Sequence, residues 1–153
     1  MTVATEPQEI SLPDIEALQF VRLKIPRLIP MDLVENVKGR TFTPEQFFKY
    51  QEANVENPYN HLYVLVDDTK KIKGYLWAEL TVLDDSLFVN TFSICKEYWC
   101  KGQAIPKVVK FLHWLKDRTK AKRVFWVTTN EKFFLKHGFS RSKNVLMEYN
   151  QDK

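Results

Sequence analysis

The stretch from Ile94 to Leu112, ICKEYWCKGQAIPKVVKFL, joins a strand-like run to a helix through a loop that carries a glycine and lysines. A loop that turns into a helix presents backbone N–H groups without intrahelical partners, and the helix dipole adds positive charge at that end. Gly102 permits close approach of a ligand to the backbone, and Lys101 and Lys107 add charge. This arrangement is typical of a site that binds a phosphate group.

Other reactive residue types are spaced in ways that do not indicate a site. The histidines His61, His113 and His137 are far apart and lack the spacing of metal ligands, so no metal site is predicted. Cys95 and Cys100 form a C-x4-C pair, which is a weak signal, and a structural thiol is favoured over a reactive one. The sequence contains neither a Walker-type phosphate loop nor a Ser-His-Asp set.

The composition is that of one globular domain. The chain has 153 residues, 44% hydrophobic and 27% charged, which excludes a wholly disordered chain. Its two cysteines are too few for a disulfide-rich secreted scaffold and favour a reducing compartment, so we expect a cytoplasmic protein. No apolar run is long enough to predict a membrane span. Residues 1–16 are interpreted as an acidic N-terminal tail, followed by a single domain at 17–153.

Charge is distributed unevenly along the chain. The net charge is +4, with an acidic first two thirds and a strongly basic part from residue 101 onward. A basic segment predicts an anionic partner, such as a phosphorylated ligand, nucleic acid or an acidic surface, while a solvated lysine-rich face is an equally good interpretation. The cations that would form a nucleic-acid face are Lys110, Lys116, Arg118, Lys120, Lys122 and Arg123.

The elements that must position these residues follow from periodicity and turn signals. The first half is predicted as an edge strand at 18–25, helices at 31–37 and 44–56, and an antiparallel meander at 61–66, 72–82 and 87–94. The second half is predicted as a helix at 103–118, a central strand at 123–127 covered on both faces, a short helix at 131–137 and a strand at 145–149. Because a strand–helix–strand crossover is parallel and right-handed, the step from Leu87 to Val127 predicts one parallel pair in a mixed, mostly antiparallel sheet of an α/β (α+β) fold.

Two segments resemble signatures of the GNAT superfamily of N-acyltransferases. The family has a strand with an apolar end, then a loop of pattern Q/R-x-x-G-x-G/A that opens a helix; Ile94, Tyr98 and the run from Lys101 to Ala104 take those positions here. The segment from Thr129 to Phe139, TNEKFFLKHGF, is similar to a second signature, an Asn that opens a helix ending in K-x-G-F. The element order agrees from Leu18 to Tyr149, so the chain is interpreted as a divergent member with a GNAT-like fold and helices on both faces of the sheet.

The resemblance implies an acyltransferase that uses acetyl-CoA (CoA) to acetylate an amine of a small molecule or protein by direct attack on the thioester. In the family, the pyrophosphate of CoA rests on the loop, and the pantetheine arm pairs with the backbone at the end of the strand. Backbone N–H near Ile94 would polarise the thioester carbonyl. The cofactor-binding residues that this implies are Phe92, Ser93, Ile94, Trp99, Lys101, Gly102, Gln103, Ala104, Asn130 and Phe134.

Catalysis would also need a group that takes a proton from the ammonium form of the amine. The candidate is Glu79 on the second meander strand, ahead of Asp84 and Asp85 in a turn. Trp99 departs from the family pattern, since Gln or Arg helps to hold phosphate there, and Phe134 stands where many family enzymes have a tyrosine that protonates the leaving thiolate. Two alternatives to an enzyme therefore stay open: a catalytically inert GNAT-like structural or binding protein, such as a phage or virion component, and a basic nucleic-acid-associated protein.

Overall fold

A five-stranded mixed sheet lies between two layers of helices in the computed structural model, which describes residues 15–37, 42–81, 83, 85–99, 103–127 and 131–142, except the side chains of Glu131 and Phe133. The strands lie side by side in chain order; β1 to β4 are antiparallel to their neighbours, and β4 and β5 are parallel. Their bounds are β1 Gln19–Arg22, β2 Asn60–Val66, β3 Ile72–Thr81, β4 Ser86–Ile94 and β5 Arg123–Trp126.

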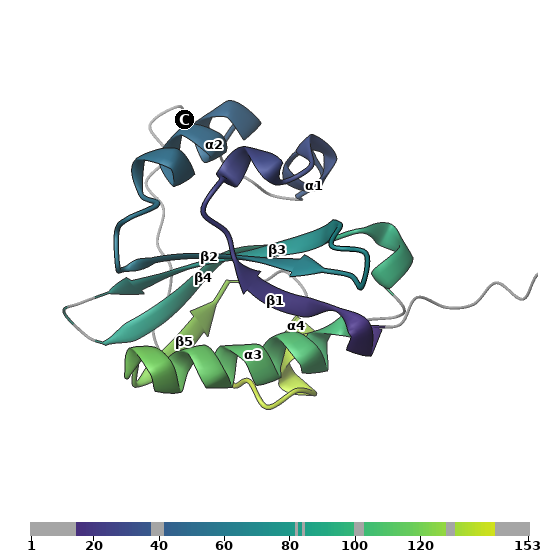
Figure 1. Cartoon of the computed structure of the whole chain (residues 1–153). Helices are drawn as coiled ribbons and strands as arrows, with labels where there is room; N and C mark the ends of the chain where they lie inside the picture. The colour runs from purple at the N-terminus through teal and green to yellow at the C-terminus, as the bar shows by residue number, and fades with distance from the viewer. Residues whose placement is uncertain are drawn as a thin grey trace, which may run out of the picture.

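Helices cover both faces of the sheet, as predicted. Helices α1 and α2 lie on one face, and α3 and α4 lie on the other (Figure 1). Their bounds are α1 Met31–Glu35, α2 Pro44–Ala53, α3 Ala104–Thr119 and α4 Glu131–Leu135, with short 3-10 turns at η2 Ile15–Ala17, η3 Pro26–Leu28 and η4 Lys96–Tyr98. The predicted fold class, a mixed and mostly antiparallel sheet with one parallel crossover pair, is therefore confirmed.

Local sequence signals begin the main helices. The Thr43 hydroxyl accepts a hydrogen bond from the backbone N–H of Gln46 at 3.1 Å, and the Gln46 side chain accepts one from the backbone N–H of Thr43 at 2.8 Å. This reciprocal pair is the capping box of α2. Helix α3 is amphipathic, and the residues that it buries against the sheet are Ala104, Val108, Leu112 and Leu115.

Strand side chains alternate between two cores, one under each helical layer. On β3, Leu76 and Ala78 belong to the core under α3, whereas Tyr75 belongs to the core under α1 and α2, with Trp77 packed against it. Because strand residues alternate with a period of two, Glu79 continues the second set and faces the side of α2. The N-terminal turn of the described domain is packed as well: Ile15 in this turn contacts the cluster of Leu18, Leu65 and Tyr98.

Strand β5 pairs with β4 alone within the described residues. The strand predicted at 145–149 lies outside them, so the central position of β5 stays a prediction. The bulky rings of β5 pack toward α4: the ring centroids of Trp126 and Phe134 are 4.6 Å apart. Val127, directly after the strand, is exposed. Helix α4 ends at Leu135, and Gly138, with a φ of 91°, follows as the predicted stop signal.

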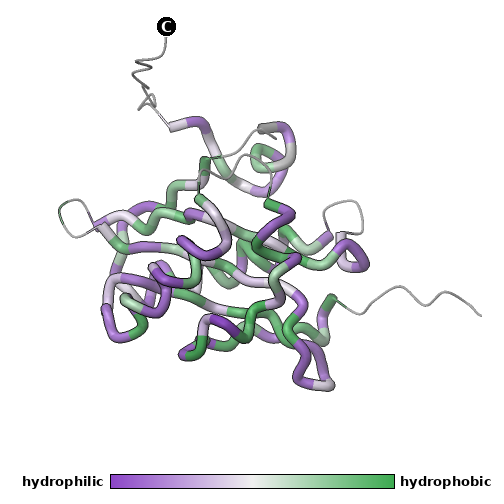
Figure 2. Tube along the Cα trace, turned by 90° about the horizontal axis from the view of Figure 1, so that it is seen from above, coloured by the Kyte–Doolittle hydropathy of each residue, from purple (hydrophilic) through white to green (hydrophobic). Residues whose placement is uncertain are grey.

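Hydrophobic and hydrophilic residues are interleaved along the whole described trace (Figure 2). In keeping with this pattern, none of the described helices has the length and apolar character that crossing a membrane requires. Helix α3, the longest of these, has 16 residues and carries lysines along its exposed side.

Gly74 on β3 is expected to tolerate no side chain. A Cβ atom there would lie 2.7 Å from the carbonyl oxygen of Ser93 and 3.2 Å from the Cα of Ile94, both backbone atoms of β4. Gly74→Ala should therefore push the end of β4 away from β3 and lower the free energy of unfolding by about 1–3 kcal/mol. Urea denaturation measures the loss, and hydrogen exchange should show faster exchange of the Cys95 amide, which donates to Lys73 O at 2.8 Å.

Gly138→Ala is the matched control for this substitution. A Cβ atom at Gly138 would meet nothing within 4 Å, but its φ of 91° is unfavourable for alanine. This variant should lose about 1 kcal/mol through backbone strain and leave the exchange of the Cys95 amide unchanged. If Gly74→Ala were as stable as the parent protein, β4 would be free to move away from β3 without cost.

Candidate active site

Strand β4 is longer than its parallel neighbour, so part of its edge has no strand partner in the described sheet. Ser86–Val89 pair with Arg123–Trp126, where β5 ends, whereas β4 continues to Ile94. On its other side β4 stays paired with β3 as far as Gly74, opposite Ile94. We call residues 90–94, on the side away from β3, the open edge. An extended chain can add to such an edge as a further strand.

The hydrogen-bonding pattern decides which residues face the open edge. The backbone N–H of Cys95 donates to Lys73 O at 2.8 Å, so Cys95 points its backbone groups toward β3. Because this direction alternates along an antiparallel strand, Ser93 also points toward β3, and Phe92 and Ile94 point toward the open edge. The Ser93 hydroxyl is used elsewhere: it donates to the carbonyl of Leu33 in α1 at 2.8 Å.

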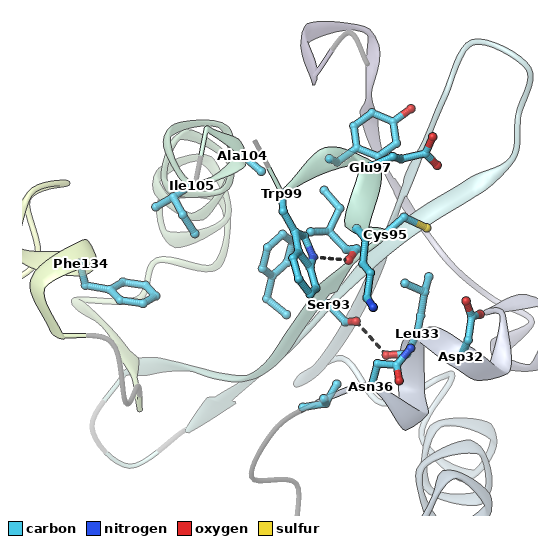
Figure 3. A pocket seen from close by; sticks show the side chains of 15 residues that line it. Asp32, Leu33, Asn36, Ser93, Cys95, Glu97, Trp99, Ala104, Ile105 and Phe134 are labelled. Carbon is cyan, nitrogen blue, oxygen red and sulfur yellow. Dashed lines mark hydrogen bonds between the residues drawn. The ribbon is translucent and has the colours of Figure 1, made fainter. Parts of the chain in front are cut away.

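A cavity of about 810 Å³ lies beside the open edge. Phe92 and Ile94 form its sheet side, Leu33 of α1 closes one flank, and Trp99 and Phe134 border it near α3 and α4. Figure 3 shows the Phe134 ring pointing from α4 toward this space and the Trp99 ring lying between the end of β4 and α3. The cavity thus collects residues from segments that are far apart in the sequence.

The start of α3 meets the same cavity. Ala104 lines it and is only 4% exposed, and Gln103 in the N-cap position makes no side-chain capping bond. The first turn of α3 contains no acidic residue, so the positive end of the helix dipole is not neutralised by its own side chains. Lys101, Gly102 and Asn130, which complete the predicted cofactor set, lie outside the described residues.

Glu79 does not line the cavity, and it is held by two donors on the α2 side of the sheet. The Tyr50 hydroxyl of α2 donates to one carboxylate oxygen, and the Asn90 side-chain amide donates to the other at 2.8 Å. Asn90 is a β-bulge: the register passes from Ala78 opposite Val89 to Trp77 opposite Thr91 and skips it. A carboxylate fixed in this way can accept a proton from a group that approaches over α2.

The contact with Glu79 changes the acidity of the Tyr50 hydroxyl. Its hydrogen bond to Glu79 and its partial burial raise the pKa of Tyr50 to about 12. Tyr50 is therefore a neutral hydrogen-bond donor at physiological pH and keeps Glu79 oriented. From Asn90 to Ile94 the strand advances by about 13 Å, which separates this carboxylate from the outer end of the cavity.

The remaining candidate side chains have structural surroundings. Burial raises the pKa of the Cys95 thiol, so Cys95 is not activated as a nucleophile. Glu97 pairs with Lys73 at 3.0 Å, and exposed Asp85 lies 3.9 Å from Lys122 in the turn before β4. Asp84, the other alternative base, lies outside the described residues. No metal-binding cluster of His, Cys, Asp or Glu occurs in the part of the chain that the structure describes.

The cations of the basic segment lie away from this cavity. Lys110, Lys116 and Arg118 belong to α3, and Lys120, Lys122 and Arg123 follow in the turn and the start of β5. Five of the six are exposed and Lys116 is half-buried, and the Arg118 guanidinium lies 5.3 Å from the centroid of the Trp114 ring. Binding of nucleic acid by this face stays a prediction.

The sequence did not point to Tyr50 or Asn90. Tyr50 is 29 positions from Glu79 along the chain, and beside Phe47 and Phe48 it is typical of the apolar contact residues of a helix. Asn90 carries a weak signal, a polar side chain in the middle of an apolar strand, which is also typical of an exposed position. Pairing them with Glu79 required the register of β3 and β4 and the placement of α2 over the sheet.

Comparison with solved structures identifies the fold. No protein-family model matches this sequence, and no curated protein matches it in sequence. Glucosamine-6-phosphate N-acetyltransferase from Arabidopsis thaliana is similar in structure, with a TM-score of 0.60, 22% identity, and coverage of 88% of this chain and 99% of that chain. A mutant form of spermidine N-acetyltransferase from Vibrio cholerae has a TM-score of 0.70, 14% identity, and coverage of 88% of this chain and 86% of that chain.

A third structure carries a ligand. The protein AAC(6')-Iy, in complex with the bisubstrate analogue CoA-S-monomethyl-acetylneamine, has a TM-score of 0.67, 9% identity, and coverage of 88% of this chain and 98% of that chain. At these identities the likeness is one of fold. The chain has the GNAT fold.

Proposed function

We propose that this protein is an N-acyltransferase that transfers an acyl group from acetyl-CoA to an amine of a small molecule or protein. The observation that carries the proposal is the open edge of β4, which faces a cavity of about 810 Å³. The oriented carboxylate of Glu79 lies outside the lining of this cavity and is hydrogen-bonded to Asn90, the residue at which the open edge begins. The GNAT fold supports it, as do neighbours named for acetyl transfer to spermidine and glucosamine 6-phosphate and for a complex with a CoA-based analogue. We extend the proposal to a cytoplasmic location, which two cysteines favour.

The described residues fit CoA in most respects. Phe92 and Ile94 would pair with its pantetheine arm through the open edge, and Ser93 would support the wall of the cavity. Gln103 and Ala104 at the start of α3, with Lys101 and Gly102 before them, would hold the pyrophosphate. Asn130 would contact the arm. Trp99 and Phe134 border the same cavity but bring neither charge nor an acidic proton to it.

Acetyl-CoA supplies, when bound, an acyl group as a thioester. Glu79 would take the proton from the ammonium form of the amine, while Tyr50 and Asn90 keep its carboxylate aimed. A backbone N–H group of the open edge that the arm leaves free would hold the carbonyl oxygen as negative charge builds on it. Because Phe134 has no proton to donate, the leaving thiolate would take its proton from water.

A second candidate function is that of a catalytically inert GNAT-like structural or binding protein. Two observations favour it. Phe134 stands where the resemblance implies an acid, and Trp99 stands where it implies a phosphate-holding side chain. The inert protein and the enzyme make different predictions for CoA binding and for transfer, so one set of measurements separates them.

Binding of CoA is expected to stabilise the fold. At a free concentration one hundred times its Kd, CoA should raise the free energy of unfolding by about 2.7 kcal/mol, measured by thermal or urea denaturation. Gly102→Glu should abolish the gain, because it places bulk and negative charge where the pyrophosphate would sit. The control Gln46→Glu adds the same charge at a capping-box position that accepts glutamate, and it should keep the gain.

Release of free CoA from acetyl-CoA should then be followed with spermidine, an aminoglycoside and a lysine peptide as acceptors. Turnover with any of them supports the enzyme. CoA binding without turnover supports the inert relative. No stabilisation of the parent protein by millimolar CoA would remove the cofactor from both candidates.

A further inference from the structure

The indole of Trp99 is hydrogen-bonded to a backbone carbonyl group of the open edge. Its Nε1–H donates to the backbone oxygen of Ile94 at 3.0 Å. Figure 3 shows this bond as a dashed line, with the indole beside the end of β4 and inside the space bordered by α3. This carbonyl is the outermost backbone acceptor that the open edge presents to the cavity.

The indole therefore stands in the way of an extended chain on this edge. A chain that adds to β4 needs the Ile94 carbonyl as an acceptor for one of its own N–H groups. A carbonyl oxygen has a second lone pair, but the ring itself borders the cavity beside the end of the strand. Through its hydrogen bond to Ile94 and the bulk of its ring, Trp99 competes with an amide-bearing arm for the outer end of the open edge.

The surroundings of Trp99 allow the side chain to leave without unfolding its neighbours. The preceding turn η4 is anchored by Tyr98, which is 6% exposed and whose N–H donates to Cys95 O at 2.9 Å. The adjacent ion pair of Glu97 with Lys73, at 3.0 Å, holds the same turn to β3. Trp99 itself is 52% exposed, and the Lys96 ammonium lies 5.8 Å from its ring centroid. A rotation of the indole would thus leave η4 in place.

We propose that Trp99 is a gate residue of the candidate active site. Its indole closes the outer end of the open edge by hydrogen bonding to Ile94, and a ligand arm with a secondary amide N–H displaces it on binding. The proposal rests on the proposed function, because it takes the open edge as the place where the arm of CoA pairs. It adds a residue that sets the affinity for this arm by competition.

Three ligands separate the gate from other roles of Trp99. Pantetheine has the amides of the arm but no phosphate, adenosine 3′,5′-bisphosphate has phosphates but no amide, and CoA has both. Trp99→Phe keeps a ring but loses the competing N–H. By titration calorimetry, its Kd for pantetheine and for CoA should be about two- to tenfold lower than that of the parent protein, which is the range of one neutral hydrogen bond. Its Kd for adenosine 3′,5′-bisphosphate should be unchanged.

Trp114→Phe is the matched control, because Trp114 is a comparably exposed tryptophan on α3 that does not line the cavity. It should leave all three Kd values unchanged. The fluorescence difference between the parent protein and Trp99→Phe reports the indole directly. This difference spectrum should shift to longer wavelength when pantetheine binds, as the ring enters water, and should not shift with adenosine 3′,5′-bisphosphate.

The gate would be overturned, and the proposed function left standing, if Trp99→Phe had the same Kd as the parent protein for CoA and the same Kd as the parent protein for pantetheine. Weaker binding by Trp99→Phe would also overturn it, because the indole would then be a ligand contact. If CoA binds to neither the parent protein nor the variant, the proposed function fails and the gate fails with it.

Discussion

Glu79→Gln is expected to lower the rate of acyl transfer at least a hundredfold while leaving CoA binding unchanged. A carboxylate that accepts a proton from the attacking amine contributes typically a hundred- to ten-thousandfold, and an amide cannot accept this proton. Glutamine has nearly the same shape, and its carbonyl oxygen can still accept the hydrogen bond from Asn90. The fold should therefore be kept. The measurements are the initial rate of CoA release with an accepted amine and the Kd for CoA.

Glu45→Gln is the matched control for this substitution. It removes a carboxylate of the same type from an exposed ion pair with Arg27, at 2.8 Å, on the outer side of α2. Its rate should stay within about twofold of the parent rate, because an exposed pair contributes little and lies away from the open edge. If Glu79→Gln transfers acyl groups as fast as Glu45→Gln, Glu79 is not the base and serves only to tie Tyr50 to Asn90.

The stability of the protein is expected to fall steeply between pH 6.5 and pH 4 because of His61. This side chain is 6% exposed, and neither of its ring nitrogens has a hydrogen-bond partner among the described residues. Burial, together with the positive charge of Arg22, lowers the pKa of His61 from 6.5 to about 4. Below pH 6.5 the unfolded chain binds a proton at this position that the folded chain does not bind, so acid favours unfolding.

The size of this effect follows from the two pKa values. His61 should remove about 2 kcal/mol of unfolding free energy by pH 5 and about 3 kcal/mol by pH 4, relative to pH 8. Urea denaturation of the parent protein and of His61→Leu at several pH values isolates this part from the titration of carboxylates. His61→Leu should lack this pH-dependent loss of unfolding free energy. His113→Leu, a substitution at an exposed histidine, should retain it. Parallel pH curves for the parent protein and His61→Leu would show that the pKa of His61 is the same in the folded and the unfolded chain.

Those parts of the fold that depend on short stretches of sequence were predictable. The capping box of Thr43 and Gln46 was visible because its two hydrogen bonds join residues three positions apart. The meander and α3 were predictable because periods of two and of 3.6 residues are recorded in the residues themselves. The parallel pairing of β4 with β5 was predictable because the helix between the two strands returns the chain to the same end of the sheet. Ile94, Trp99 and Ala104 were predicted together from the resemblance, and they line one cavity because they are close along the chain.

The sequence alone did not decide the surroundings of these residues. The hydrogen bonds of Tyr50 and Asn90 to Glu79 depend on how α2 lies over β3 and on a one-residue bulge in β4, and neither leaves a periodic trace in the sequence. The contact between the rings of Trp126 on β5 and Phe134 on α4 likewise joins two segments that carry no local sign of it. The bond from Trp99 to Ile94 depends on the path of η4. A sequence records what each residue prefers from its neighbours along the chain, whereas contacts between distant segments form only when the whole sheet has set their distance and direction.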